Sequence, residues 1–200
     1  MNCHQVLSGA CNSGDQCFAV GSVEGIPFTA YAAGCNIVIL ASNFERVQII
    51  PGAIHGYIRI SSLDCSTDTG KIAAAYGAEV CIFEPTPLIH TASTTHGLEY
   101  RWVQTGKLVA DGPITALSWN LEGTRLLTGG RILQLWHQAS LYQDDSQPSS
   151  GVTFQIGGDK DEKPKQADDE EPLYYTFIYV AHPRAVTHLS WRKTSKYMPK

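Results

Sequence analysis

The 200-residue sequence predicts an all-β fold assembled from repeated four-strand units. Its apolar residues fall into short runs bounded by Gly, Asn and Pro, and such runs suit strands and are too short for helices. One group of runs recurs along the chain at a period of roughly 40–50 residues, which is typical of β-propeller arrays. With 43% apolar and 10% aromatic residues, the chain has enough apolar side chains for a packed core.

The repeat is clearest between Ile114 and Trp136, where the apolar runs are separated by the breaks Asn120–Gly123 and Gly129–Arg131. Three consecutive strands joined by tight turns form an antiparallel meander, which is most of one propeller blade. The runs predict these strands: Ile114–Trp119, Arg125–Thr128 and Ile132–Trp136.

The same pattern recurs on both sides of this unit. Residues 70–83 align with residues 123–136 without a gap, and residues 29–40 end in the same way. Further on, V-T-H-L-S-W at Val186–Trp191 repeats I-T-A-L-S-W at Ile114–Trp119. The chain is therefore predicted to form a partial β-propeller of about three blades plus the start of a fourth.

The other strands follow in chain order from the same signals. The first blade is predicted to use Cys17–Val23, Phe28–Ala33, Asn36–Leu40 and Arg46–Ile50. The second is predicted to use Tyr57–Cys65, Lys71–Tyr76, Glu79–Phe83 and Tyr100–Gln104, with a Pro-Thr-rich loop at Glu84–Gly97. The third blade takes its outer strand from Tyr174–Val180, and the fourth begins with Val186–Trp191.

An acidic insertion separates the third blade from its outer strand. Between His137 and Pro172 there are nine acids and three bases, so its net charge is 3 − 9 = −6 and that of the remaining chain is −4 + 6 = +2. This composition cannot bury enough apolar surface to offset the entropy of ordering, so we predict disorder. The expected domains are blades one to three at residues 1–136, the disordered insertion at 137–172, and the outer strand with the next blade's start at 173–200.

The motifs that accompany enzymatic chemistry are missing from the sequence. Gly70-Lys71 and Gly106-Lys107 lack both the preceding Gly and the following hydroxyl of a phosphate-binding loop. His182 and His188 are spaced for one face of a strand, but no Cys, Asp or Glu completes a metal-ligand set. We predict a protein that is not an enzyme and has no catalytic, cofactor-binding or metal-binding residues. A propeller enzyme with a site in the central channel is the alternative from another class.

Cysteine usage and charge indicate the compartment and the class of partner. All six cysteines lie in the first half of the chain without a C-x-x-C pair or a visible secretory signal, which predicts reduced thiols in the cytoplasm. No apolar run approaches the ~18–20 residues that span a bilayer. The basic residues after Trp191 are interpreted as a blade turn and not as a nucleic-acid surface.

Six residues are predicted to hold structural positions in the blades: His55, Phe83, Trp119, Trp136, His182 and Trp191. The two histidines each precede an innermost strand, where WD-type repeats place a histidine that hydrogen-bonds inside the blade. Phe83 and Trp136 end the third strand, where such repeats carry Trp. The aspartate usual in the turn before that strand is replaced by Ala78-Glu79 and Gly130-Arg131. The units are therefore interpreted as degenerate WD40-type repeats with a partial hydrogen-bonded tetrad.

Four stretches closely resemble the N-terminus of the DmX-like proteins, also called the rabconnectin family: His4–Ala10, Gly34–Ala53, Arg125–Trp136 and Ala181–Pro199. The resemblance implies a large cytosolic WD-repeat scaffold that forms a complex with a second WD-repeat protein. That complex promotes assembly of the vacuolar-type proton pump by joining its peripheral catalytic sector to its membrane sector. The implied partners are the second WD-repeat protein and peripheral pump subunits, with no nucleic acid and only indirect membrane association.

The resemblance also implies a place in the cell and a process. The protein would lie in the cytoplasm and peripherally on endosomal or synaptic-vesicle membranes, where it would support acidification and affect Notch trafficking. Two departures stand out, because the family carries a further blade before the A-H-P-R-A-V segment and its propeller continues past the end of this chain. A short isoform or fragment is therefore expected. A protein-binding propeller of another vesicle-trafficking complex is the alternative.

The blade interpretation makes a prediction about two tryptophans. Trp119→Ala and Trp136→Ala are each expected to lower the free energy of unfolding by about 3–5 kcal/mol, because both rings would fill the core of the third blade. Thermal melts of the two variants beside the parent chain measure the effect. Near-neutral melts for both would show that the third blade is not packed in this way.

Overall fold

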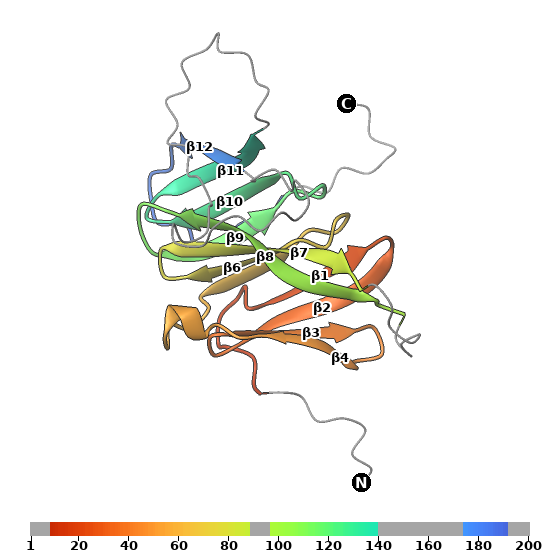
Figure 1. Cartoon of the computed structure of the whole chain (residues 1–200). Coiled ribbons are helices and arrows are strands. Elements are labelled where there is room, and N and C mark those ends of the chain that lie inside the picture. The colour runs from red at the N-terminus through yellow and green to blue at the C-terminus, as the bar shows by residue number, and fades with distance from the viewer. Residues whose placement is uncertain (1–8, 89–96, 140–173, 192–200) are drawn as a thin grey trace, which may run out of the picture.

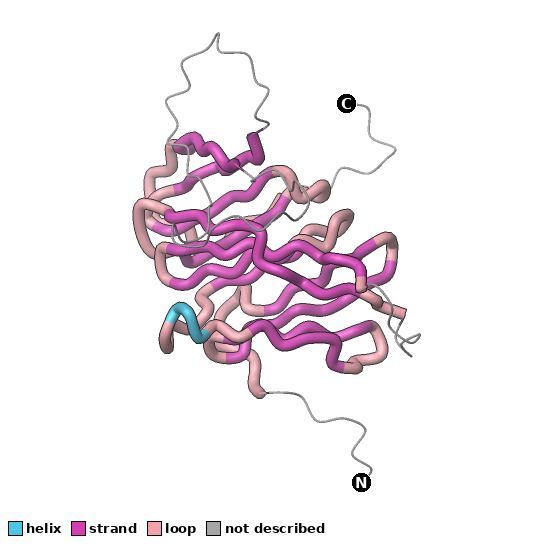
Figure 2. Tube along the Cα trace, viewed as in Figure 1, coloured by secondary structure: helices cyan, strands magenta, loops and turns pink. Residues whose placement is uncertain are grey.

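The computed structural model describes residues 9–88, 97–139 and 174–191, and it confirms the all-β prediction (Figure 1). The described residues form twelve strands in three four-stranded antiparallel sheets, with one short 3-10 helix at Ala53–His55. The sheets are stacked along the chain direction, and strands dominate the trace (Figure 2). This architecture agrees with a partial WD40-type propeller. Residues 140–172 of the expected insertion lie outside the described residues, whereas residues 137–139, which were expected to be disordered, are the end of a strand.

Each sheet is one blade, and its strands are paired in chain order. Blade 1 contains β1 (Phe18–Val23), β2 (Ile26–Ala33), β3 (Asn36–Ala41) and β4 (Arg46–Ile50). Blade 2 contains β5 (Ser62–Cys65), β6 (Ile72–Tyr76), β7 (Glu79–Pro87) and β8 (Tyr100–Val109). Blade 3 contains β9 (Ile114–Trp119), β10 (Arg125–Gly130), β11 (Leu133–Ala139) and β12 (Tyr174–Val180).

The structure corrects several of the expected elements, and β8, for example, continues to Val109 and does not end at Gln104. β5 begins at Ser62 and not at Tyr57, because the chain from Ala53 first makes a helical turn. β7 continues to Pro87, so the expected Pro-Thr-rich loop begins as a strand. β6 pairs with β7 only as far as Ile72↔Phe83. Beyond that pair, β7 is paired with β8 along one edge. The prolines in this part of β7 therefore interrupt no hydrogen bonds to a strand on its other edge. Residues 186–191 are not a strand, because the described chain gives them no strand partner.

The apolar core consists mainly of two layers between successive blades. The first layer lies between blades 1 and 2 and includes Phe28, Ile37 and Trp102, while the second lies between blades 2 and 3 and includes Ile82 and Trp136. Phe28 and Trp102 pack with their ring centroids 4.7 Å apart. Since alternate side chains of a strand point to opposite faces, blade 2 contributes to both layers. The sequences of β6 and of residues 80–83 in β7 are accordingly continuous apolar runs.

A repeated main-chain joint connects each blade to the next. The first residue of the incoming segment donates its N–H to the carbonyl of the glycine that ends, or directly follows, the second strand of the preceding blade. The three joints are Ile60 N to Gly34 O at 3.0 Å, Ile114 N to Gly77 O at 2.8 Å and Val186 N to Gly130 O at 2.7 Å. All three donor residues are buried, so the joint fixes an apolar side chain between the blades.

A side-chain donor from the preceding segment completes every joint. It donates to the carbonyl of the same incoming residue: Asn12 Nδ2 to Ile60 O at 3.0 Å, Ser61 Oγ to Ile114 O at 2.7 Å, and Thr115 Oγ1 to Val186 O at 2.6 Å. Both main-chain groups of the incoming residue are thereby satisfied, which a buried backbone requires.

Gln16 connects the inner parts of all three blades. Its Oε1 accepts from Leu117 N at 3.1 Å and from Ser62 Oγ at 3.4 Å, while its Nε2 donates to Leu189 O at 2.9 Å. Its own carbonyl accepts from Leu63 N at 2.6 Å. One side chain just before β1 therefore links β5, β9 and the segment after β12.

Gln16→Ala is expected to lower the free energy of unfolding by about 1–3 kcal/mol, because it leaves the Leu117 N–H without its acceptor. Urea denaturation followed by tryptophan fluorescence measures the change. Asp15→Ala, at the exposed neighbouring position, is the matched control and should leave the midpoint unchanged. Equal midpoints for both variants would contradict the role assigned to Gln16.

Candidate functional site

His55 is held inside blade 2 by three partners. It ends the 3-10 helix, and its ring stacks on Tyr76 with centroids 4.1 Å apart and planes at 20°. Its Nδ1 lies 3.2 Å from Glu79 Oε2, and its Nε2 lies 3.2 Å from Cys81 Sγ. When Nδ1–H donates to the carboxylate, Nε2 is left to accept from the thiol. The histidine thus connects the loop before β5 to β6 and β7.

Glu79 is the first residue of β7 and follows the turn where the sequence lacks the usual aspartate. Besides His55, its carboxylate receives Lys107 Nζ at 2.8 Å from β8. The hydrogen bond from Lys107 lowers the pKa of Glu79, and the charge of Lys107 and the contact with His55 act in the same direction. Glu79 therefore provides the acidic partner of the histidine, in place of the aspartate that is missing from the preceding turn.

Cys81, His55 and Glu79 have the order of partners found in cysteine nucleophile sets, but the thiol is not placed for such chemistry. Cys81 is 0% exposed, and burial raises its pKa to about 11. A reactive cysteine needs a lowered pKa and access to its substrate. The three residues are therefore a structural cluster. Among the described residues, no group of three or more His, Cys, Asp or Glu side chains is placed to hold a metal ion.

Trp136 forms the corresponding polar contact in blade 3. Its ring is fully buried, its Nε1 donates to Thr128 Oγ1 at 3.0 Å, and it packs on Phe177 with centroids 4.6 Å apart. In blade 2, Phe83 takes the Trp position and is buried in the layer against blade 1. Blade 2 thus has a histidine–acid pair and blade 3 has a tryptophan–hydroxyl pair.

The remaining predicted positions differ in their surroundings. Trp119 is buried between blades 2 and 3, and its Nε1 has no hydrogen-bond partner among the described residues. Trp191 is half-buried and donates from Nε1 to Ser118 O at 2.8 Å. His182 is exposed, and its Nδ1 lies 2.6 Å from Arg184 O. His182 lies outside the sheets, since the chain that follows it is not paired into a blade.

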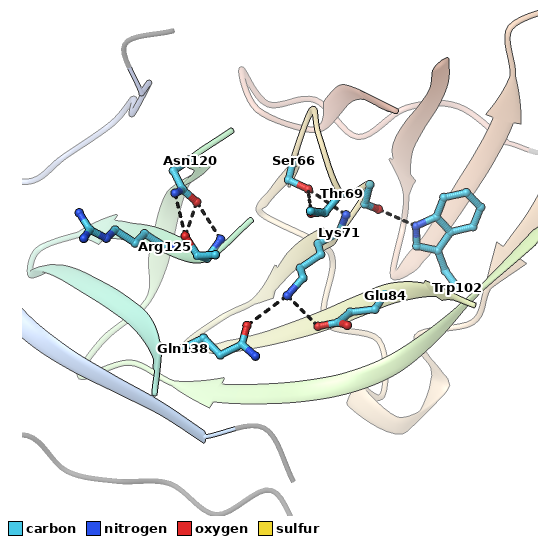
Figure 3. Close-up of polar contacts among 10 residues, drawn as sticks. Ser66, Thr69, Lys71, Glu84, Trp102, Asn120, Arg125 and Gln138 are labelled. Carbon is cyan, nitrogen blue, oxygen red and sulfur yellow. Dashed lines mark hydrogen bonds and ion pairs between the residues drawn. The ribbon is translucent and has the colours of Figure 1, made fainter. Parts of the chain in front are cut away.

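Lys71, directly before β6, also joins blade 2 to blade 3 through a polar contact (Figure 3). Lys71 Nζ lies 3.0 Å from Glu84 Oε1 and 3.3 Å from Gln138 Oε1. The backbone N–H of Lys71 donates to Ser66 Oγ at 3.0 Å, which orders the turn before β6. The Gly70 carbonyl accepts from Trp102 Nε1 at 2.8 Å. The Gly70-Lys71 pair is therefore an internal contact between blades and does not form a phosphate site.

An apolar surface loop was missed by the sequence analysis, which assigned part of it to a strand. Ile54, Tyr57 and Ile58 are 77%, 101% and 51% exposed, and they follow one another in the loop that His55 anchors. Large apolar side chains exposed together mark interaction sites, and Tyr is frequent in binding hot spots. We call these three residues the Tyr57 patch. Gly52 and Gly56 around it are the sequence signal that could have identified a loop.

Two phenylalanine substitutions test the polar roles of the buried tryptophans. Both replace an indole ring by the same smaller phenyl ring, but Trp136→Phe also removes the hydrogen bond to Thr128. Trp136→Phe is therefore expected to lower the free energy of unfolding by about 1–3 kcal/mol more than Trp119→Phe does. Urea denaturation of the two variants measures the difference directly. A larger loss for Trp119→Phe would contradict the assignment.

Comparisons with known proteins find relatives that match the whole chain. DmX-like protein 1 of Mus musculus is 39% identical over 249 residues, and DmX-like protein 1 of Homo sapiens is 38% identical over 251 residues. Both matches cover 100% of this chain and 8% of the relative. The Saccharomyces cerevisiae protein named "Regulator of V-ATPase in vacuolar membrane protein 1" is 23% identical over 94% of this chain and 14% of its own length.

No protein-family model matches the chain. In the part of the chain that the structure describes, no helix is long and apolar enough to cross a bilayer. The chain spans less than a tenth of the DmX-like proteins, and the similarity to them extends over all of this chain. The protein therefore belongs to the DmX-like, or rabconnectin, family.

Proposed function

We propose that the protein is a non-enzymatic scaffold in a complex that promotes assembly of the vacuolar-type proton pump. The observation that carries this proposal is the full-chain identity of 39% to DmX-like protein 1, joined to the weaker match with a yeast protein named as a V-ATPase regulator. The partners are a second WD-repeat protein and peripheral subunits of the pump. Through them the protein reaches endosomal or synaptic-vesicle membranes from the cytoplasm, supports acidification and influences Notch trafficking.

The structure supports a mechanism based on rigid presentation of surfaces. Polar groups in the blades are mostly engaged with one another, as the contacts of His55, Glu79 and Lys107 illustrate. The Tyr57 patch combines exposed apolar side chains with a backbone anchored through His55, so binding costs little ordering entropy. A scaffold needs such pre-organised contact areas and no reactive group. This favours the scaffold over a propeller enzyme.

A protein-binding propeller of another vesicle-trafficking complex is the alternative function. It would use the same surfaces with different partners, and the two proposals therefore differ only in what the protein captures. The match to a relative named for the V-ATPase favours the pump.

Affinity capture with the tagged 200-residue chain tests the proposal. We expect it to retain peripheral pump subunits and a second WD-repeat protein, and we expect Tyr57→Lys to reduce their recovery about tenfold, because a charged side chain would be buried against an apolar partner surface. Phe44→Lys, at a residue that is 61% exposed on another loop, is the matched control and should not change recovery.

Capture of no pump subunit above the level of the tag alone would contradict the proposed function. If Tyr57→Lys leaves the recovery of pump subunits unchanged, the proposed function stands and the contact with the subunits lies outside the Tyr57 patch.

A further inference from the structure

A cleft lies beside the Tyr57 patch, between the outermost strands of blades 1 and 2. Its volume is about 300 Å³. Residues of β4, β7, β8 and the 3-10 helix line it, among them Gln48, Ile50, Ile54, Phe83, Trp102 and Gln104. We call it the β4–β8 cleft. Ile54 belongs both to this lining and to the Tyr57 patch, so the cleft and the patch form one continuous surface.

Side-chain hydrogen bonds hold the two walls of the cleft at a fixed spacing. Gln48 of β4 donates from Nε2 to Trp102 O at 2.9 Å, and its Oε1 accepts from Trp102 N at 2.8 Å. The amide thereby takes the place of a neighbouring strand for that residue of β8. His55, which also lines the cleft, stacks on Tyr76, whose hydroxyl donates to Cys35 O at 3.1 Å. The cleft is therefore formed before a partner arrives, which lowers the cost of binding.

Buried aromatic residues give the cleft its capacity for an apolar side chain. Tyr76, Phe83 and Trp102 line it and are at most 4% exposed, whereas Ile54 is 77% exposed. An engineered apolar cavity of about half this volume binds benzene, so the cleft has room for one aromatic or large aliphatic side chain. Pockets that desolvate such an anchor carry most of the binding energy of an interface.

The surface around the cleft carries positive charge without neighbouring acids. Residues 46–63 contain two arginines and no acidic residue. Arg59 directly follows the Tyr57 patch, is exposed, and forms no ion pair with any described residue. The lining of the cleft includes Arg101 and no Asp or Glu. Glu79, the acid that contacts His55, is already paired with Lys107. A partner with carboxylates would therefore complement the charge of this surface.

We propose that the Tyr57 patch and the β4–β8 cleft together bind a short acidic segment of a partner polypeptide. One aromatic or large aliphatic side chain of the segment enters the cleft, adjoining apolar side chains lie on the Tyr57 patch, and a carboxylate pairs with Arg59. The anchor provides most of the affinity, and the carboxylate provides selectivity against basic segments. This inference rests on the proposed function, because it specifies the partner chemistry of the same contact surface.

Selection from a random peptide library displayed on phage tests the inference without a prior choice of partner. The immobilised 200-residue chain is the bait, and the library is first depleted on the Ile54→Asp variant to remove peptides that bind elsewhere. We expect the enriched peptides to share an aromatic or large aliphatic residue and to carry more Asp and Glu than Lys and Arg.

The most enriched peptide is then synthesised with a fluorescein label and titrated with the chain by fluorescence anisotropy. We expect Arg59→Glu to weaken binding at least about fivefold, because an attraction becomes a repulsion. Arg125→Glu, at an exposed arginine that begins β10 in blade 3, makes the same change in net charge and should bind like the parent chain. Replacing the acids of the peptide by their amides should weaken binding to the parent chain but not to Arg59→Glu.

Circular dichroism confirms that both arginine variants are folded. Enrichment of no peptide after depletion would overturn the inference, as would enriched peptides without an excess of acids. Equal binding to the two arginine variants would overturn it as well.

These experiments use no pump subunit, so the two proposals fail separately. A chain that captures pump subunits but selects no acidic peptide contradicts this inference alone. A chain that selects acidic peptides but captures no pump subunit contradicts the proposed function alone.

Discussion

Coverage of each sheet face by the next sheet is the constraint on which the rest of the structure depends. A four-stranded blade exposes two apolar faces, and it becomes stable only when neighbours bury them. Blade 2 is covered on both sides, and its β6 residues are all buried as a result. The repeated joint at Ile60, Ile114 and Val186 sets where each new blade meets the previous one. Packing between blades, and not the pairing of strands alone, therefore holds the array together.

The polar contacts inside the blades refine this packing. The His55–Glu79 pair in blade 2 and the Trp136–Thr128 pair in blade 3 are two halves of the polar network expected for WD40-type repeats. Each half satisfies buried donors and acceptors that would otherwise destabilise the blade. Since the apolar layers already determine the arrangement, a complete tetrad in every blade is not required. This accounts for a regular stack built from degenerate repeats.

The division between interior and surface bears on function. The Cys81 thiol is buried and paired with His55, whereas large apolar side chains such as Tyr57 are exposed at the surface. Exposed apolar patches of this kind are typical of surfaces that contact other polypeptides. The Tyr57 patch lies on the segment that His55 anchors, so a contact there would not require the core to rearrange.

Local sequence determined the strands and their period, because apolar spacing and turn residues act over a few positions. The bounds of β9 and β12 could be predicted in this way, as could the three-blade repeat and the burial of Trp136. Tertiary structure alone decided that Glu79 replaces an aspartate, that the chain after Ala53 turns as a helix, and that residues 186–191 dock without pairing. Those outcomes depend on partners distant in the sequence, since a strand exists only beside another strand and a buried histidine is positioned by whatever surrounds it.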